Sequence, residues 1–383
     1  MKILLLYPYF NQQQLMQNFI LRLSEYGIEA DVVCFNNLVV EKNASVKWPK
    51  SVQRYFRIFG HCDSFGRSLK SRLTRMLRRL LDSYYLIRLL RLYDLVDFHA
   101  YILSYQFLMK ECLRHNLKFD ITIWGSDLMR ASDKELEEMR FGLNNCYRIK
   151  VIDNLKERLT ECYGHKYDEK CRIVYFGSSE IDYIDGITEA EVVEIKEKLY
   201  GETANKIIIV CGYNSGINQN HKQMIEALSL LSEEEKSRIH VVLPMTYLGS
   251  EEYRNKIKKQ IESLNISFTI LDRFLDIKEV AVIRKTADIT LNIQKTDALA
   301  SSLKGHLYCG NVCIFGDWLR YGVYTDNGIY YIKTSIEDIA HHLKDVLQNY
   351  PSYKELCKDN HDKIRELFSW EVTMKKQVAV YGE

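Results

Sequence analysis

The sequence lacks several of the patterns that would assign a function at once. None of its ten cysteines belongs to a CxxC pair or to a zinc-type spacing, and no D-x-D metal motif occurs. No segment approaches about 18 uninterrupted apolar residues, so no bilayer-spanning helix is predicted. A net charge of only +2 over 383 residues gives no global argument for nucleic-acid binding. The function therefore has to be read from local patterns.

Composition and length describe a globular protein of more than one domain. Hydrophobic residues make up 46% and charged residues 27% of the chain, which is the balance of a folded protein. A chain of 383 residues exceeds one ordinary core, so two domains are expected. Cysteines inside apolar segments, such as Cys211 and Cys313, indicate free thiols in a reduced, cytoplasmic compartment. The short apolar run MKILLLYPYF is expected to be a first strand rather than a signal peptide.

The first half of the chain alternates strand-like and helix-like segments. The loop after the first strand has no glycine, so no dinucleotide is expected there. Polar residues end two later strands: His99 closes one, and Asp127 follows another on a glycine turn. Ligands sit at the carboxyl ends of strands in open α/β sheets, so both residues are candidates for catalysis. His99 could instead be a core residue, and Asp127 a helix cap. Strands are predicted at residues 2–7, 28–34, 95–99, 120–124, 148–153 and 172–175.

Residues 67–92 are predicted to form a helix with one apolar and one cationic side. From Arg54 to Arg91 there are ten Lys or Arg residues against two Asp residues, a local excess of +8. Two interpretations remain open: a core-packed helix with a solvated basic back, or a surface that docks on anionic lipid headgroups. The arginines assigned to that surface are Arg72, Arg75, Arg78 and Arg79.

The stretch from Ile207 to Leu228 reads as a buried strand, a polar loop and an amphipathic helix. Gly212 and Gly216 allow a tight turn, although their GxxxG spacing matches neither the dinucleotide motif nor the P-loop. The following helix directs unpaired N–H groups and its positive dipole end at this loop, which suits a nucleotide pyrophosphate. A plain connection without a ligand is the alternative.

The same alternation continues to the C-terminus, with a domain boundary expected around residue 185. A helix at 190–200 opens with Thr188 and Glu191 at capping-box spacing. Two consecutive α/β domains result, and a cleft is expected between the carboxyl ends of their sheets. Further strands are predicted at residues 239–244, 268–271, 288–293, 312–315 and 327–332.

This order of elements resembles the GT-B glycosyltransferases, which have two facing Rossmann-like domains and bind a sugar nucleotide mainly in the C-terminal one. The segment Phe368-Ser369-Trp370 is similar to the F-S-W ending of many such enzymes, whose last helix crosses back onto the N-terminal domain. The resemblance implies an acceptor-binding domain at 1–185, a nucleotide-sugar domain at 186–366 and a returning helix at 367–383.

A closer similarity is to the lipid-linked acetamidofucose (Fuc4NAc) transferases of enterobacterial common antigen synthesis. It rests on a WGxDL turn at 124–128, an NSG loop at 214–216 followed by Asn220 and His221 with changed spacing, and a Pro-Met-x-Tyr segment at 244–247. It implies transfer of a sugar from a nucleotide-sugar donor to a polyprenyl-diphosphate-linked saccharide. Because no D-x-D motif occurs, the leaving group is expected to be handled without a divalent ion, and no cofactor is expected. The implied setting is surface polysaccharide synthesis, such as capsule or O-antigen, by a peripheral protein on the inner face of the cytoplasmic membrane.

The residues assigned to the donor lie on loops of the second domain. Charge develops on the departing diphosphate, and fixed N–H donors and cations stabilise it. Arg273 and Lys304 could also be surface charges, and the serines helix caps. An inverting reaction needs a base, with Asp127 the first choice and His99 the second, whereas a retaining reaction needs none. The donor set is Gly212, Asn214, Ser215, Gly216, Asn218, Met245, Tyr247, Arg273, Phe274, Leu275, Asp297, Ser301, Ser302 and Lys304.

The sequence departs from the GT-B pattern at one motif. Many of these enzymes carry E-x7-E in the second domain, whereas here Gln294 opens that loop and no glutamate pair follows. Two alternatives from other classes therefore stay open: a sugar-nucleotide epimerase of the same architecture, and a non-catalytic GT-B-like scaffold. The sequence predicts neither the sugar, the nucleotide nor the oligomeric state.

Overall fold

The computed structural model describes residues 1–383 except 8–12, 35–39, 60–68, 202 and 204–205. Side chains are described except at these positions and at 13–14, 34, 40–42, 56–59 and 69–79. The chain divides into two compact units: unit 1 comprises Met1–Tyr175 with Met374–Glu383, and unit 2 comprises Phe176–Thr373. It first leaves unit 1 after Tyr175, earlier than the expected boundary near residue 185.

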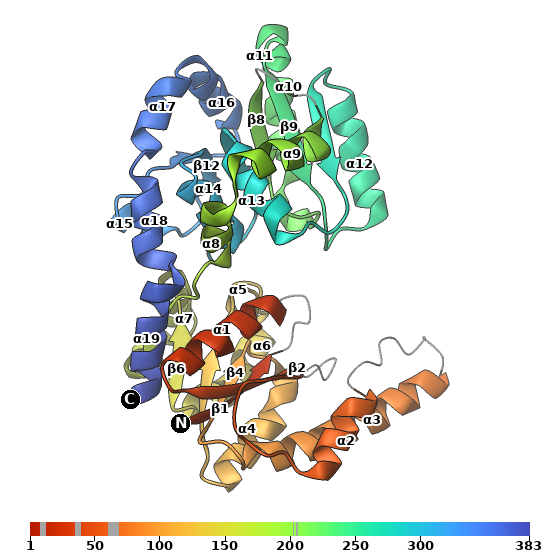
Figure 1. Cartoon of the computed structure of the whole chain (residues 1–383), viewed down its shortest axis with the longest axis vertical. Helices are drawn as coiled ribbons and strands as arrows, with labels where there is room; N and C mark the ends of the chain where they lie inside the picture. Colours follow the sequence, from red (N-terminus) through yellow and green to blue (C-terminus); the bar gives the residue numbers. More distant parts are fainter. Residues whose placement is uncertain (8–12, 35–39, 60–68, 202, 204–205) are drawn as a thin grey trace. The chain divides into compact units, whose positions relative to one another are not determined.

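A seven-stranded sheet forms the centre of unit 1 (Figure 1). Its order is β3-β2-β1-β4-β5-β6-β7, and every pair is parallel except β2 with β3 at one edge. Strand β1 is apolar at nearly every position, as expected of a parallel strand that is covered on both faces, whereas β4, β5 and β6 mix apolar with buried polar or charged residues. The strands are β1 (Lys2–Tyr7), β2 (Glu29–Cys34), β3 (Val40–Lys42), β4 (Leu95–His99), β5 (Lys118–Thr122), β6 (Arg148–Val151) and β7 (Cys171–Ile173).

In unit 1, helices lie between most successive strands along the chain. The last helix of the chain, α19, also packs in this unit from Met374 onward. Ser132 and Glu135 cap α6 reciprocally, which satisfies N–H groups that the helix itself leaves unpaired. The helices are α1 (Gln13–Glu25), α2 (Lys50–Phe59), α3 (Leu69–Leu90), α4 (Gln106–Arg114), α5 (Gly125–Met129), α6 (Asp133–Asn145), α7 (Asp153–Tyr163), the 3-10 helices η2 (Leu103–Tyr105) and η3 (Gly164–Lys170), and α19 (Trp370–Gly382).

The last turn of α19 completes a buried ionic cluster in unit 1. The Tyr381 hydroxyl donates to Asp97 and accepts from the Lys150 ammonium, each at 2.6 Å. Lys150 also forms an ion pair with Asp97. Arg148 donates to both oxygens of Asp120 at 2.8 to 3.1 Å. All five side chains are buried. Specific polar contacts therefore hold the C-terminal helix in the core of unit 1.

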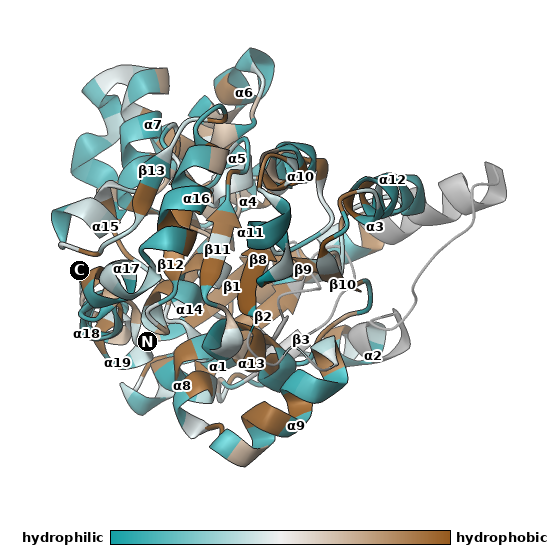
Figure 2. Ribbon diagram, turned by 90° about the horizontal axis from the view of Figure 1, so that it is seen from above, coloured by the Kyte–Doolittle hydropathy of each residue, from teal (hydrophilic) through white to brown (hydrophobic). Residues whose placement is uncertain are grey.

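Unit 2 is built on a six-stranded, fully parallel sheet in the order β10-β9-β8-β11-β12-β13. Strand β8 is hydrophobic, whereas helix α12 is mostly hydrophilic (Figure 2). Apolar side chains pack on both faces of the sheet in two clusters. The strands are β8 (Ile207–Cys211), β9 (Ile239–Pro244), β10 (Ser267–Leu271), β11 (Ile289–Asn292), β12 (Val312–Gly316) and β13 (Ile332–Thr334).

Helices link the strands of unit 2, and the capping box predicted at Thr188 and Glu191 is confirmed. The helices are α8 (Ser179–Gly186), α9 (Glu189–Tyr200), η4 (Ile217–Gln219), α10 (His221–Ser229), α11 (Glu233–Ser237), α12 (Glu251–Glu262), α13 (Ile277–Thr286), α14 (Ser301–Tyr308), α15 (Gly322–Asp326), α16 (Ile339–Gln348), α17 (Tyr350–Cys357) and α18 (Asn360–Phe368).

Candidate functional site

One glutamine ties together the loops that follow β8 and β11 in unit 2. Gln294 lies just after β11, and its side-chain oxygen accepts hydrogen bonds from Tyr213, Asn218 and Gln219 at 3.0 to 3.3 Å. Asn218 also donates to the carbonyl of Thr296 at 2.8 Å. Asn218, predicted to contact the donor, thus positions the loop. The buried side-chain nitrogen of Gln294 has no hydrogen-bond partner in the described part of the chain.

The predicted phosphate loop after β8 is bonded to the loop after β9. The N–H and hydroxyl of Ser215 both donate to the Tyr247 carbonyl, at 2.9 and 2.6 Å. The Gly216 N–H donates to the side chain of Asn214 at 2.8 Å. The N–H groups of Ser215 and Gly216 therefore already have protein acceptors, and binding of a pyrophosphate by this loop stays a prediction. The half-exposed ring of Tyr247 still borders the loop.

Unusual backbone geometry gathers at the carboxyl ends of the strands. Ala100, Leu248 and Leu299 have φ values of +66°, +75° and +70°, and they follow β4, β9 and β11 respectively. Residues other than glycine rarely adopt such values, at a cost of about 1–3 kcal/mol each. Gly212 also has a positive φ of +69°, which suits its residue type. Strain of this kind is typical of functional loops.

The loop from β11 into α14 holds a carboxylate in a fixed place. Asp297 accepts from the Tyr321 hydroxyl at 2.5 Å and from the Ala300 N–H at 2.8 Å. Burial raises the pKa of Asp297, and these hydrogen bonds oppose the rise. The predicted Asp297 thus lies at the entrance of α14, with one oxygen committed to the protein.

The first turns of α14 carry a buried cation without an anionic partner. Lys304 is 7% exposed and lies over the Phe368 ring, with its ammonium 4.5 Å from the ring centroid. It makes no ion pair with another described residue; Glu180 and Asp297 act on it only at longer range. Burial lowers its pKa to about 8, against the pull of those two carboxylates. The buried Ser302 hydroxyl has no hydrogen-bond partner among the described residues, whereas Ser301 is exposed.

Two predicted donor residues are core residues instead, which corrects the prediction. Met245 is fully buried in one apolar cluster of unit 2, and Leu275 packs in the other. Arg273 is not a free cation, because it forms an ion pair with Glu279 on α13, with one contact of 2.8 Å. Phe274 is 73% exposed. Phe274 can therefore meet a ligand directly, and Arg273 is half exposed beside its ion pair with Glu279.

Other large apolar side chains are exposed on the same edge of unit 2 as Phe274. Ile217 follows β8 and is 63% exposed, and Leu248 follows β9 and is 77% exposed. Exposed apolar side chains on neighbouring loops are typical of binding surfaces. Together with Tyr247 they border the loops that hold Asn218 and Ser215.

In unit 1, Asp127 joins two loops at the carboxyl ends of β4 and β5. One of its oxygens accepts from the N–H groups of Trp124 and Tyr101, both at 2.8 Å, and the other from Ser126 at 3.2 Å. The contact with Trp124 is the helix cap that the sequence left open as an alternative. Burial raises the pKa of Asp127 to about 6, and the hydrogen bonds limit that rise. A carboxylate with this pKa is ionised at neutral pH and suited to accept a proton.

His99 is a core residue, so the prediction that it serves as a base is wrong. Its side chain is 0% exposed, and its Nε2 lies 3.2 Å from Asp97 of the ionic cluster. The rings of Tyr7, Phe19 and Trp124 surround it. Burial lowers the pKa of His99, and an acceptor hydroxyl has no access to the ring.

Three residues that shape these sites were not predicted from the sequence as site residues. Gln294 directly follows a predicted strand, so the same rule that selected Asp127 would have found it. Tyr101 and Tyr321 bond to the two key aspartates from distant loops, and no spacing in the sequence connects them.

Three remaining predictions concern the cationic helix, metal binding and membrane spans. Arg72, Arg75, Arg78 and Arg79 lie in α3, but their side chains are outside the described part. Over the described ranges, no cluster of three His, Cys, Asp or Glu side chains could hold a metal ion. In the same ranges, no helix is long and apolar enough to cross a membrane.

Comparison with known proteins places this architecture. No family model and no curated protein sequence matches the chain. Among solved structures, HepE (Alr3699) of Anabaena in complex with UDP and glucose has a TM-score of 0.74 at 11% identity, covering 100% of this chain and 99% of that one. A glycosyltransferase from Rickettsia africae ESF-5 has a TM-score of 0.69 at 14% identity, covering 99% and 97%. Sucrose-phosphate synthase from Thermosynechococcus elongatus has a TM-score of 0.71 at 12% identity, covering 99% and 98%.

These similarities define the class of the fold. The chain has the GT-B fold of glycosyltransferases, which confirms the α/β architecture expected from the sequence. Its two sheets and their flanking helices correspond to those of the solved glycosyltransferases over nearly the whole chain.

Proposed function

We propose that the chain is a glycosyltransferase that moves a sugar from a nucleotide-sugar donor to a polyprenyl-diphosphate-linked saccharide in bacterial surface polysaccharide synthesis. The observation that carries the donor half is Lys304, a buried cation without an anionic partner at the start of α14. The similar HepE structure contains UDP and glucose, which supports this donor class. The motifs shared with the acetamidofucose transferases support the acceptor.

Under this proposal, unit 2 stabilises the leaving diphosphate. The Lys304 ammonium supplies positive charge. The Ser302 hydroxyl, which has no hydrogen-bond partner among the described residues, supplies a hydrogen bond to the diphosphate. Both lie within the first turn of α14, whose dipole also favours an anion. Asp297 accepts hydrogen bonds from the donor sugar with its other oxygen. Lys304 and the dipole of α14, rather than a divalent ion, then stabilise the negative charge of the leaving group.

Unit 1 supplies the base for the acceptor hydroxyl if configuration inverts. Asp127 is ionised at neutral pH, and its position is fixed by backbone N–H groups from two loops. A retaining reaction would leave Asp127 only to position sugar hydroxyls. The anomer of the product distinguishes these routes.

The acceptor implies work at a membrane surface. We propose a peripheral location on the inner face of the cytoplasmic membrane, with the arginines of α3 toward anionic lipid headgroups. Each Lys or Arg near a charged membrane contributes about 1 kcal/mol. The fraction of protein that co-sediments with vesicles should therefore rise with their anionic lipid content. Binding that is independent of the anionic lipid content would contradict the proposed membrane location.

A thermal-shift screen against UDP, dTDP, GDP and CMP tests the donor half. A ligand at 100 times its dissociation constant stabilises the folded protein by about 2.7 kcal/mol. We expect a selective shift with one nucleotide, followed by transfer to a lipid-linked sugar. Conversion of the nucleotide sugar without an acceptor would favour an epimerase. No shift and no turnover with any donor would favour a non-catalytic scaffold.

A further inference from the structure

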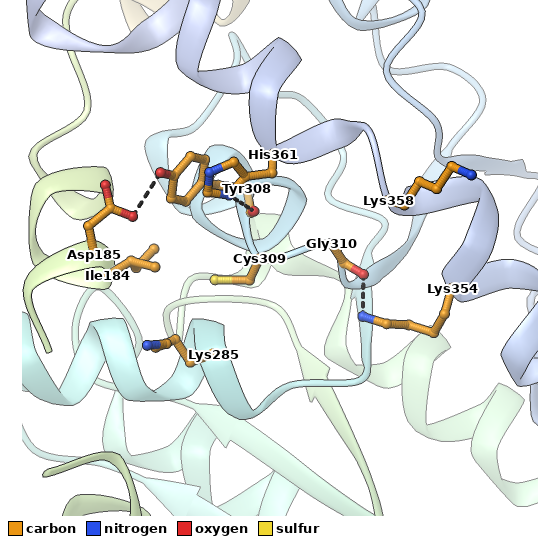
Figure 3. Close-up of a pocket in the computed structure, with 9 residues that line it drawn as sticks. All are labelled: Ile184, Asp185, Lys285, Tyr308, Cys309, Gly310, Lys354, Lys358 and His361. Carbon is orange, nitrogen blue, oxygen red and sulfur yellow. Dashed lines mark hydrogen bonds between the residues drawn. The ribbon is translucent and has the colours of Figure 1, made fainter. Parts of the chain in front are cut away.

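A pocket of about 580 Å³ lies in unit 2, at the C-terminal end of α14 (Figure 3). Cys309 and Gly310 of its lining follow the end of α14, and Lys285 lies in the last turn of α13. These helix ends lead into the amino ends of β12 and β11, whereas the donor loops leave the carboxyl ends. Lys304 lies one helical turn, about 6 Å along the axis of α14, before Tyr308 of the lining, and its ammonium lies over the Phe368 ring.

The lining of this pocket is cationic. Lys285, Lys354 and Lys358 belong to it, together with His361. Its one carboxylate, Asp185, accepts a hydrogen bond from Tyr308 at 2.8 Å and forms an ion pair with Arg365. The charge of Asp185 is thus compensated from outside the pocket, and the lysines give the lining an excess of positive charge.

The lysines can turn to a ligand at little cost. Lys285 contacts Glu189 at 3.4 Å, and that glutamate is 88% exposed. Lys358 pairs with Glu355, which is 68% exposed. Exposed ion pairs of this kind contribute only about 0–1 kcal/mol, so an anion can replace them. Lys354 donates one N–H to the Gly310 carbonyl and keeps two further donors.

The remaining wall suits an organic molecule rather than a bare ion. The Tyr308 and His361 rings stack with their centroids 4.1 Å apart, and Ile184 adds an apolar side chain (Figure 3). Burial raises the pKa of the Cys309 thiol to about 12, so this sulfur is neutral and adds to the apolar wall. The volume falls in the range of about 300–1,000 Å³ that small-molecule sites occupy, well above one phosphate.

We propose that this pocket binds a small soluble metabolite that carries a phosphate group. Lys285 and Lys354 bind the phosphate, and the organic part lies against Ile184 and the stacked Tyr308 and His361. The site joins α8, the first helix of unit 2, to α18, which precedes the return of the chain to unit 1. No residue of its lining belongs to the proposed nucleotide-sugar site, so the inference does not depend on that proposal.

Calorimetric titration of the full-length protein with glucose 6-phosphate tests the proposal, with glucose as the uncharged probe and inorganic phosphate as the probe without an organic part. We expect glucose 6-phosphate to bind more tightly than phosphate, and glucose not to bind. The double variant Lys285→Gln/Lys354→Gln should bind at least about tenfold more weakly, because two charge-assisted hydrogen bonds are lost. The matched control Lys256→Gln/Lys259→Gln removes the same charge from exposed positions of α12 and should stay within about twofold.

Lysine acetylation read by mass spectrometry gives a second measurement on the unmodified chain, in case the double variant folds poorly. Glucose 6-phosphate should protect Lys285 and Lys354 and leave Lys256 unchanged. The proposal is overturned if neither phosphate probe binds at millimolar concentration, if both double variants bind equally, or if the pocket lysines are not protected.

Discussion

Replacement of Asp127 by asparagine should abolish sugar transfer without weakening the fold. The asparagine keeps an oxygen that can accept the N–H groups of Trp124 and Tyr101, so the two loops stay joined. What it removes is the negative charge and the ability to take a proton. Activity and stability are therefore expected to respond in different directions.

The stability side follows from the pKa of Asp127, which burial raises from 3.8 to about 6. The folded state holds this proton more tightly than the unfolded state, so ionisation destabilises the fold as the pH rises from about 4 to about 6. A pKa difference of about 2 corresponds to about 3 kcal/mol, a cost that is fully present at pH 7. Asparagine never ionises, so the variant should be as stable as the wild type or up to about 3 kcal/mol more stable at pH 7.

The activity side is measured as kcat/KM for transfer to a lipid-linked acceptor, together with nucleotide affinity by calorimetry. Loss of a general base costs about 10²- to 10⁴-fold in rate, while the nucleotide dissociation constant should change by less than about twofold. The wild-type profile should show activity falling below a pH of about 6. Glu135→Gln is the matched control, because Glu135 also accepts a hydrogen bond from the N-cap N–H of its own helix, α6, but is exposed.

Two results would refute this reasoning. If Asp127→Asn lowers the melting temperature and nucleotide binding together with activity, Asp127 is a structural cap and not a base. If the variant keeps its activity, and the wild-type profile is flat between pH 5 and 7, the route by a base at Asp127 is excluded.

Two further predictions concern unit 2. Lys304→Met should weaken binding of the nucleotide that the screen identifies by at least about tenfold in calorimetry. The affinity of the wild type should also fall above pH 8, because Lys304 loses its proton there. Unchanged affinity in the variant would show that Lys304 does not bind the nucleotide. Gly249→Ala should destabilise the protein by about 1–3 kcal/mol in thermal denaturation, because its Cβ would lie 2.2 Å from the Ser215 carbonyl oxygen. The control Gly186→Ala, with no atom within 4 Å of the new Cβ, should be neutral or stabilising. Equal changes in stability for the two variants would contradict the close packing of Gly249 against Ser215.

Much of the architecture could be predicted because it depends on short-range patterns. Runs of β-branched residues such as 207–210 predict buried strands, and the Thr188/Glu191 spacing predicts a helix start that the structure contains. The rule that ligands sit at carboxyl ends of strands also selected Asp127 as a candidate, whereas the need for a cation at the leaving diphosphate selected Lys304. The relevant signal in each case lies within a few residues of the chain.

The same rule could not separate sites from core. His99 and Met245 follow or end strands as Asp127 and Tyr247 do, yet both are fully buried. Whether a side chain at a strand end meets solvent depends on the elements packed over it. Aromatic rings from β1 and α1 cover His99, and no local pattern announces them.

The sequence by itself determined the alternation of strands and helices, because apolar periodicity and helix caps act between near neighbours. Only the tertiary structure decided which polar groups are occupied. Gln294 and Tyr213 are 81 positions apart, and Asp97 and Tyr381 are 284 positions apart, yet each pair shares a hydrogen bond. Such bonds form only after the sheets have assembled, since each buried polar group takes the partner that folding brings within reach.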